Sequence, residues 1–165
     1  MTTPIPAPDP AAHLTGAAID EQLSALPPAP QDRGRVALLV TRDEDSGRTQ
    51  PQRAHLTAEE GMPGDRWALG RADPDTQLAV MAHDIGTVIA NGQSMLLFGD
   101  NLVVDLDLSE ANLPVGSRVQ IGEAVLEVTP MPHTGCKKYA ARFGQAALKY
   151  ICLLYTSDAA DDLYR

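Results

Sequence analysis

Hydrophobic and polar residues alternate along the middle of the chain with the period of two that is typical of β-strands. In NLVVDLDLSE (101–110), the side chains of Val104, Leu106 and Leu108 share one face of a predicted strand. Aspartates occupy alternate positions on the opposite face of the same stretch. This pattern predicts a strand with one face against a hydrophobic core.

Three further stretches predict strands. The residues SRVQIGEAVLEVTP (117–130) predict a hairpin of two strands around Gly122, with Ala124 and alternate residues after it facing inward. The run RVALLVTRDE (35–44) is rich in β-forming residues and predicts one buried strand, and TQLAVMAHD (76–84) begins as another. We expect a loop at 45–53, between the strand predicted over 35–44 and the glycine-rich turn at 61–64.

Helical spacing of apolar residues appears in three places. The stretch 14–26 predicts a short helix that Thr15 can cap, and 84–92 predicts one that begins at Asp84 and ends at Asn91. The stretch KKYAARFGQAALKY (137–150) predicts a single amphipathic helix. Many short strands with helices between them predict an α+β domain, mainly β, with a barrel-like arrangement.

The domain organisation follows from where these patterns begin and end. Alternating prolines predict that residues 1–13 are extended and disordered, and 14–30 form a short helix and a linker. Residues 31–150 carry the main domain. The segment 151–165 breaks the pattern, and its CLLYTSDAADD resembles the read-through translation of a sequencing adapter. We therefore expect a non-native tail and a domain that is incomplete at its C-terminus.

Composition narrows the possible functions. The chain has 165 residues, 44% of them hydrophobic, and a formal net charge of −9, which fits one domain with a real core. The acidic balance argues against nucleic acid as a partner. We expect no membrane span and no secretory signal, so a cytoplasmic location is the default. Two cysteines 16 residues apart make no disulfide framework.

Cys136 is the strongest candidate for chemistry. It lies in MPHTGCKKYAARFG (131–144), after a Pro-His-Thr-Gly turn and at the start of a predicted helix. The helix N-terminus and the basic residues that follow favour the thiolate, which is both a nucleophile and a soft metal ligand. The alternative is a cysteine that only packs. His133 and Cys136 supply two of the three or four ligands that a closed zinc site needs, so we do not expect one.

A few polar residues could serve a ligand beside the thiol. Lys137 and Lys138 are either a solvated helix start or part of an anion site. Asp100 and Asn101, in the turn of LLFGDNLVVDLDL (96–108), either form an ordinary turn or present a carboxylate and an amide to a polar ligand.

Three stretches in this order resemble the MOSC family, the domain found at the C-terminus of molybdenum cofactor sulfurases and in stand-alone bacterial proteins. They are GMPGDRW (61–67), LLFGDNLVVDLDLSEANLPVGSRVQIGEAVLEV (96–128) and PHTGCKKYAARFGQAALKY (132–150). The similarity runs from about residue 35 to residue 150, and the HTGC-Lys stretch is its most specific part. The family normally continues past the last helix, so closure of the barrel is in question here.

The resemblance implies a MOSC-type β-barrel and an activity carried by Cys136. It implies the molybdenum cofactor as the ligand, with Cys136 either holding sulfur as a persulfide or coordinating molybdenum. It makes the following residues the expected contacts of the cofactor: Asp100, Asn101, His133, Thr134, Lys137, Lys138 and Arg142. The pyridoxal-phosphate desulfurase domain of the sulfurases is not in this sequence, so we expect no pyridoxal phosphate site here.

Three functions remain open from the sequence. The first is a molybdenum-cofactor-binding protein that acts as a sulfur carrier or as part of an oxidoreductase, with a cysteine desulfurase or a redox protein as partner. The second is a non-catalytic β-barrel interaction module in which Cys136 is structural. The third is a cysteine enzyme independent of molybdenum, with Cys136 and His133 as a pair.

Overall fold

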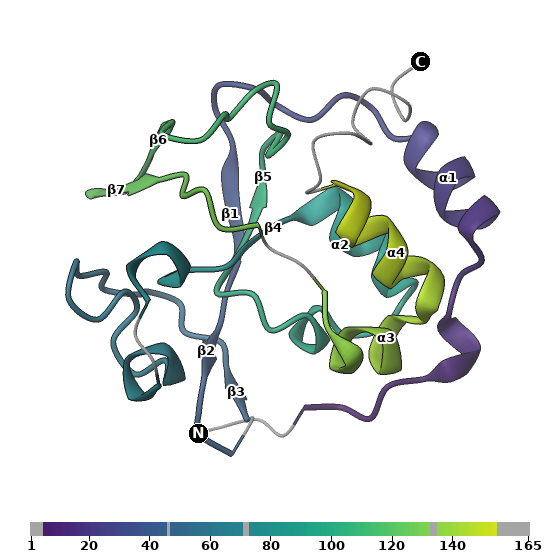
Figure 1. Ribbon diagram of the computed structural model, residues 1–165, viewed down its shortest axis with the longest axis horizontal. Coiled ribbons are helices and arrows are strands. Elements are labelled where there is room, and N and C mark those ends of the chain that lie inside the picture. The colour runs from purple at the N-terminus through teal and green to yellow at the C-terminus, as the bar shows by residue number, and fades with distance from the viewer. Residues whose placement is uncertain (1–4, 46, 71–72, 133–134, 155–165) are drawn as a thin grey trace.

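The computed structural model describes residues 5–45, 47–70, 73–132 and 135–154 of the chain (Figure 1). Its α-helices are α1 (Gly16–Ser24), α2 (His83–Ala90), α3 (Lys137–Phe143) and α4 (Gln145–Leu154). Its strands are β1 (Arg35–Leu39), β2 (Thr41–Arg42), β3 (Arg48–Thr49), β4 (Val80–Ala82), β5 (Leu102–Asp105), β6 (Arg118–Ile121) and β7 (Ala124–Glu127). The mixture supports the α+β class, but the α-helices contain more of the described residues than the strands do, so the expectation of a mainly β domain is not confirmed.

A three-stranded sheet with the order β1-β5-β4 lies at the centre of the molecule. The central strand β5 runs antiparallel to β1 and parallel to β4. The residues Leu102, Val103 and Val104 of β5 are all buried, on both faces of the sheet. The sheet therefore has core on either side, as a near-continuous apolar strand requires.

The helices cover one face of this sheet and the β6–β7 hairpin lies on the other side (Figure 1). On the helical side, Ile19 of α1, Phe143 of α3 and Ile151 of α4 pack in one hydrophobic cluster. On the other side, Met62 and Leu106 form a second cluster against which the hairpin packs. The short β2–β3 hairpin extends beyond the sheet.

Several local predictions are confirmed. Helix α1 begins after Thr15, whose Oγ1 accepts a hydrogen bond from the Ala18 N–H at 3.2 Å. The β6–β7 hairpin turns at Gly122, which has a φ of 60°. Helix α2 ends at Asn91 in the left-handed conformation, with a φ of 45°. Its start differs from the prediction: Ala82 precedes the first helical residue, and Asp84 lies inside the first turn.

Two predicted elements are each divided in the structure. The strand expected over 35–44 separates into β1 and β2 at Val40, whose N–H donates to the Asn101 carbonyl at 2.8 Å, and the loop after it contains β3. The helix expected over 137–150 separates into α3 and α4 at Gly144, which has a φ of 92°. A residue with this backbone conformation cannot continue an α-helix.

Both ends of the described chain contain helical residues where the sequence predicts a disordered segment or a non-native tail. Residues Pro10–Ala12, where the prolines predict disorder, form a short 3₁₀ helix, η1. Helix α4 runs to Leu154, and its Ile151 is buried in the core. The non-native origin expected for 151–165 stays a prediction, and 155–165 lies outside the described residues.

The described strands form three separate sheets, and none of these sheets closes on itself. The predicted barrel is therefore not confirmed in this part of the chain. No helix in the described part of the chain is both long enough and apolar enough to cross a membrane.

Candidate functional site

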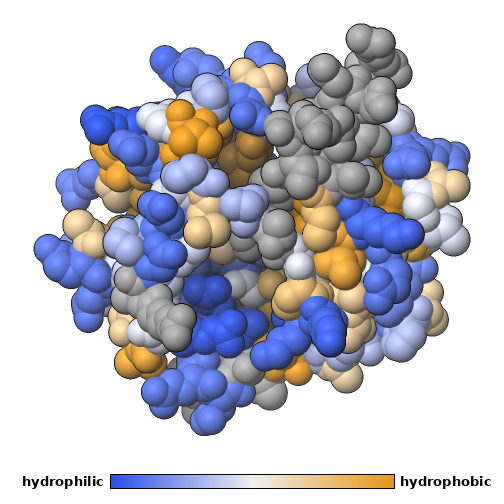
Figure 2. All heavy atoms as spheres, viewed as in Figure 1, coloured by the Kyte–Doolittle hydropathy of each residue, from blue (hydrophilic) through white to orange (hydrophobic). Residues whose placement is uncertain are grey.

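A pocket of about 140 Å³ opens beside Cys136, between the β2–β3 hairpin and helices α3 and α4. Five cationic residues of the described chain line it: Arg42, Arg48, Arg66, Lys138 and Arg142. The whole chain has 13 Lys and Arg residues against 22 Asp and Glu residues. Figure 2 shows strongly hydrophilic residues gathered in this lower central part of the visible face. Such a concentration of positive charge in an acidic protein is typical of a site for an anion.

Cys136 is the residue immediately before α3, and its side chain is exposed. Its carbonyl accepts the first hydrogen bond of the helix, from the Ala140 N–H at 3.1 Å. The thiol itself makes no capping hydrogen bond. Helix α3 has only seven residues, and the arginines of the pocket lie beside the thiol at its start.

Gly135 fixes the chain just before the thiol. A Cβ at this position would lie 2.5 Å from Leu148 Cδ1 and 3.4 Å from Ile151 Cγ2. The backbone therefore packs closely on α4, and a larger residue here would require the Leu148 side chain to move. This close approach brings Cys136 to the edge of the pocket that Ile151 also lines.

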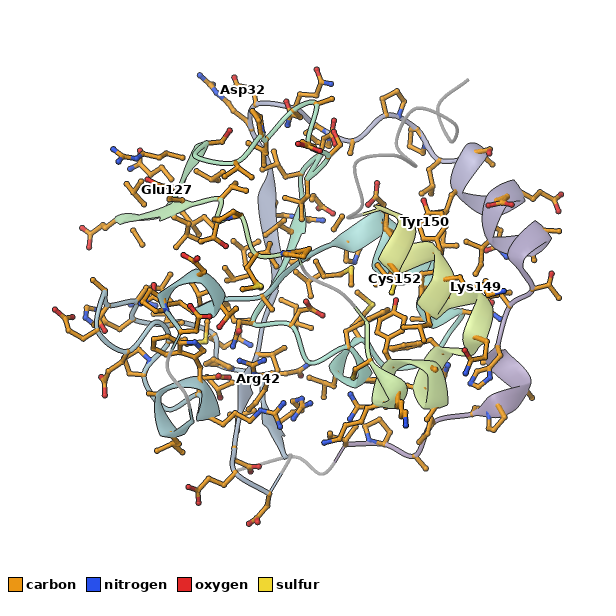
Figure 3. The ribbon with its side chains drawn as sticks, in the orientation of Figure 1. Asp32, Arg42, Glu127, Lys149, Tyr150 and Cys152 are labelled. Carbon is orange, nitrogen blue, oxygen red and sulfur yellow. The ribbon has the colours of Figure 1, made fainter. Side chains whose placement is uncertain are left out.

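Arg42 reaches the pocket from β2 and is held by the buried carboxylate of Asp65 (Figure 3). Its Nη2 donates to Asp65 Oδ1 at 2.6 Å and its Nε to Asp65 Oδ2 at 2.9 Å, so the pair is bidentate. Burial raises the pKa of Asp65, whereas the hydrogen bonds and the positive charge of Arg42 lower it. The second effect is larger, so the pKa of Asp65 lies below its usual value. Asp65 is therefore ionised at neutral pH and orients Arg42.

Asn101 completes this buried network and does not line the pocket. Its side chain is fully buried: Nδ2 donates to Asp65 Oδ2 at 2.9 Å, and Oδ1 accepts from the Ala79 N–H at 3.1 Å. Its amide thus joins the turn that carries Asp65 to the central sheet. The neighbouring Asp100 is buried as well, but it does line the pocket.

Arg48, at the start of β3, is the most deeply buried cation of the pocket, with 2% of its surface exposed. Its guanidinium packs on Gly99, where a Cβ would lie 2.8 Å from Arg48 Nη2. Burial, followed by the charges of Arg142, Arg66 and Arg42, lowers the pKa of Arg48 to about 10. The group remains protonated at neutral pH, although its neighbours repel it.

Arg142, in the last turn of α3, brings a further guanidinium to the pocket. Its Nη1 donates to the Leu97 carbonyl at 2.7 Å. Burial lowers the pKa of Arg142, the nearby Cys136 opposes this, and the charge of Arg66 lowers it again. Arg142 is therefore electrostatically coupled both to the thiol and to the cation cluster.

The structure brings together four of the residues that the sequence singles out: Asp100, Cys136, Lys138 and Arg142 all line the pocket. Lys137 is exposed and is not part of the lining. His133 and Thr134 lie outside the described residues. Among the described residues, no three His, Cys, Asp or Glu side chains are grouped so that they could hold a metal ion.

Sequence reasoning missed Arg42, Arg48 and Arg66. Arg42 lies in the stretch 35–44 that predicts a buried strand, Arg48 lies in the polar loop that follows it, and Arg66 lies in a Gly/Pro-rich turn. The spacing of these three arginines along the chain gave no signal that they meet. Only the fold shows that they converge on Cys136.

The family comparison agrees with this geometry. The sequence model of the MOSC domain matches residues 76–158, just over half of the 165-residue chain. The chain matches no curated protein and no solved structure at a significant level. The MOSC domain is associated at the family level with the molybdenum cofactor and with functions related to cofactor sulfuration. The match spans β4, β5, the β6–β7 hairpin, Cys136 and both C-terminal helices, and the chain belongs to the MOSC family.

Proposed function

We propose that this protein binds the anionic end of the molybdenum cofactor in the arginine-lined pocket and acts on it through the thiolate of Cys136. One observation carries the proposal: an exposed thiol lies on the edge of a pocket with five cationic residues. The membership of the MOSC family supports it. The same family relationship leads us to propose that the small sheets belong to a MOSC-type β-barrel.

The residues of the pocket fit the chemistry of this cofactor. Guanidinium groups bind phosphate through paired N–H donors, and the cofactor carries a phosphate. A thiolate is the soft ligand that suits molybdenum. The pocket, at about 140 Å³, is smaller than the roughly 300–1,000 Å³ that encloses a drug-sized ligand, so it suits one end of the cofactor and not the whole of it.

When bound, the cofactor supplies a molybdenum centre that accepts a soft sulfur ligand. In the sulfur-carrier form of the proposal, the Cys136 thiolate attacks the terminal sulfur of a persulfide on a donor protein. A new S–S bond forms on Cys136, the S–S bond of the donor breaks, and the donor leaves as a thiolate, with no net oxidation. A cysteine desulfurase with its own pyridoxal phosphate is the class of partner that supplies such a persulfide. The cations of the pocket stabilise the anionic sulfur on Cys136.

In the oxidoreductase form of the proposal, the Cys136 thiolate is itself the protein ligand of molybdenum, and the protein works with a redox partner. The exposure of the thiol suits both forms, because a sulfur donor and a metal both need access to it. The cation cluster favours either form over a purely structural cysteine, since an inert thiol gains nothing from neighbouring arginines.

The test compares Cys136→Ser with the matched control Cys152→Ser in a host that makes the cofactor. We expect Cys152→Ser to match the wild type in molybdenum content and to gain the mass of one sulfur atom after incubation with a cysteine desulfurase and cysteine. Elemental analysis and intact-protein mass spectrometry measure these two quantities.

The outcomes for Cys136→Ser separate the alternatives. Loss of most of the molybdenum makes Cys136 the metal ligand. Full molybdenum content with loss of the added sulfur makes it a sulfur carrier. If the folded variant keeps both the metal and the added sulfur, the proposal is wrong and Cys136 is structural. If even the wild type holds no molybdenum and gains no sulfur, a cysteine enzyme independent of molybdenum becomes the better account.

A further inference from the structure

The segment Asp9–His13, called here the N-terminal strap, lies against the end of α3. The Nε2–H of His13 donates to the Arg142 carbonyl, with 3.2 Å between nitrogen and oxygen. Because a carbonyl only accepts, this ring nitrogen carries the proton. Gln93 Nε2 donates to the same carbonyl at 3.1 Å. The orphan carbonyl of Arg142 is therefore held by two side chains that are distant from it in sequence.

The loop after α2 ties the strap in place. Gln93 uses its Oε1 to accept from the Asp9 N–H at 2.8 Å, so one side chain links the strap to α3. Asn91 Nδ2 donates to the Ala12 carbonyl at 3.0 Å. The strap is thus fixed at both of its ends.

His13 also packs against the junction between α3 and α4. At Gly144, which has a φ of 92°, a Cβ would lie 3.1 Å from both Cβ and Cγ of His13. The glycine leaves the space that the His13 side chain occupies. Just after the strap, α1 buries Ile19 in the same cluster as Ile151 of α4.

We propose that the N-terminal strap positions the pocket: His13 and Gln93 hold the Arg142 carbonyl and thereby orient the Arg142 guanidinium toward Cys136. Helix α3 has only seven residues, with the thiol immediately before its first residue and Arg142 in its last turn. A shift of its C-terminal end therefore moves both groups. The strap itself lies outside residues 76–158, the part of the chain that matches the family model.

The experiment measures the positive potential at the thiol and needs no cofactor. Cys136 is alkylated at low ionic strength with iodoacetate, which is an anion, and with iodoacetamide, which is neutral. The ratio of the two rates, read by peptide mass spectrometry, rises with positive charge near the sulfur. We expect His13→Ala and Gln93→Ala each to lower this ratio by about threefold, and the double variant to lower it further, because Arg142 moves away from the thiol.

Two variants and one internal reference serve as controls. In His13→Gln, the side-chain amide supplies an N–H donor that can extend to the Arg142 carbonyl as the histidine does. This variant should therefore have nearly the wild-type ratio. His55→Ala removes a histidine that is exposed and should leave the ratio unchanged. The same ratio at Cys152, measured in the same samples, corrects for differences in the reagents.

The proposal fails if the folded double variant keeps the wild-type ratio, even when its melting temperature falls, because the strap then only adds stability. It also fails if His13→Gln lowers the ratio as much as His13→Ala does. If His13→Ala does not fold, Gln93→Ala decides by the same criterion. Since no cofactor takes part, this result is independent of the molybdenum measurement that tests the proposed function.

Discussion

Replacing Asp65 with alanine is expected to lower the free energy of unfolding by about 3–5 kcal/mol, the usual cost of breaking a buried ion pair on one side. The Asp65 side chain is fully buried and its partner Arg42 is 15% exposed. Besides Arg42, the carboxylate accepts hydrogen bonds from the Trp67 N–H at 3.0 Å and from Asn101 Nδ2 at 2.9 Å. The variant leaves the partly buried Arg42 without its counter-charge and leaves these donors without their acceptor.

The contribution of Asp65 should depend on pH in one direction. Burial alone would raise the pKa of this carboxyl, but the hydrogen bonds and the charge of Arg42 hold it below the reference value of 3.8. A group whose pKa is lowered on folding stabilises the protein above its unfolded pKa. We therefore expect the difference between wild type and variant to be constant near neutral pH and to shrink as the pH falls below 3.8.

Urea denaturation at several pH values measures this effect, with Glu127→Ala as the matched control. Glu127, which is labelled in Figure 3, also pairs with an arginine, with 3.1 Å between its Oε2 and Arg118 Nε, but both side chains of this pair are largely exposed. Exposed pairs contribute about 0–1 kcal/mol, so this control should be nearly neutral. If Asp65→Ala lowers the free energy of unfolding as little as the control does, the buried network of Asp65, Arg42 and Asn101 does not stabilise the protein as expected.

Replacing Arg48 with methionine is expected to weaken the binding of inorganic phosphate by about tenfold or more, since a hydrogen bond to a charged group contributes about 1.5–3 kcal/mol. The stability of the unliganded protein should not fall in proportion. Burial and three neighbouring arginines lower the pKa of Arg48 to about 10, which means that they oppose its charge in the folded state. Removing the charge relieves this repulsion, which the charge of Asp65 opposes only in part, and a bound anion would oppose it further.

Titration calorimetry with phosphate measures the binding affinity, and urea denaturation measures the stability of the unliganded protein. Arg53→Met is the control because Arg53 is exposed. The control should change neither quantity. If Arg48→Met binds phosphate as well as the wild type but loses stability, Arg48 is a structural residue and the pocket does not depend on its charge.

Local signals in the sequence predicted the elements whose geometry is set by a few neighbouring residues. Thr15 caps α1 as expected, and Gly122 turns the β6–β7 hairpin. The sequence also placed Cys136 at the start of a helix, because a glycine turn precedes it and helical spacing follows. These features depend on backbone preferences that act over a few residues.

The features that the sequence could not predict depend on contacts between distant segments. The apolar spacing of a helix continues across Gly144, whereas in the structure the chain turns there with a φ of 92° and His13 packs beside the glycine. Asn101 reads as a turn residue, but its amide serves Asp65, which lies 36 residues away in sequence. Polar residues with tertiary partners look like surface residues in a sequence, because both kinds lack an apolar pattern.

The charge of the pocket is the clearest example of this limit. Arg42, Arg48 and Arg142 come from β2, β3 and α3, and their sequence neighbours give no sign that they meet. Their convergence on Cys136 follows from the position of the β2–β3 hairpin beside the helices. The sequence therefore singled out the thiol of Cys136, whereas the fold was needed to find the arginines that lie beside it.

The most direct test of the central claim is the amount of pterin and molybdenum that co-purifies with the folded wild-type protein from a host that makes the cofactor. Pterin fluorescence after oxidation and elemental analysis give both amounts per mole of protein. We predict pterin and molybdenum in equal amounts, approaching one per chain, and a large loss of both in Arg48→Met. A folded wild-type protein that carries neither, even after incubation with the isolated cofactor, would contradict the assignment of the arginine-lined pocket to the molybdenum cofactor.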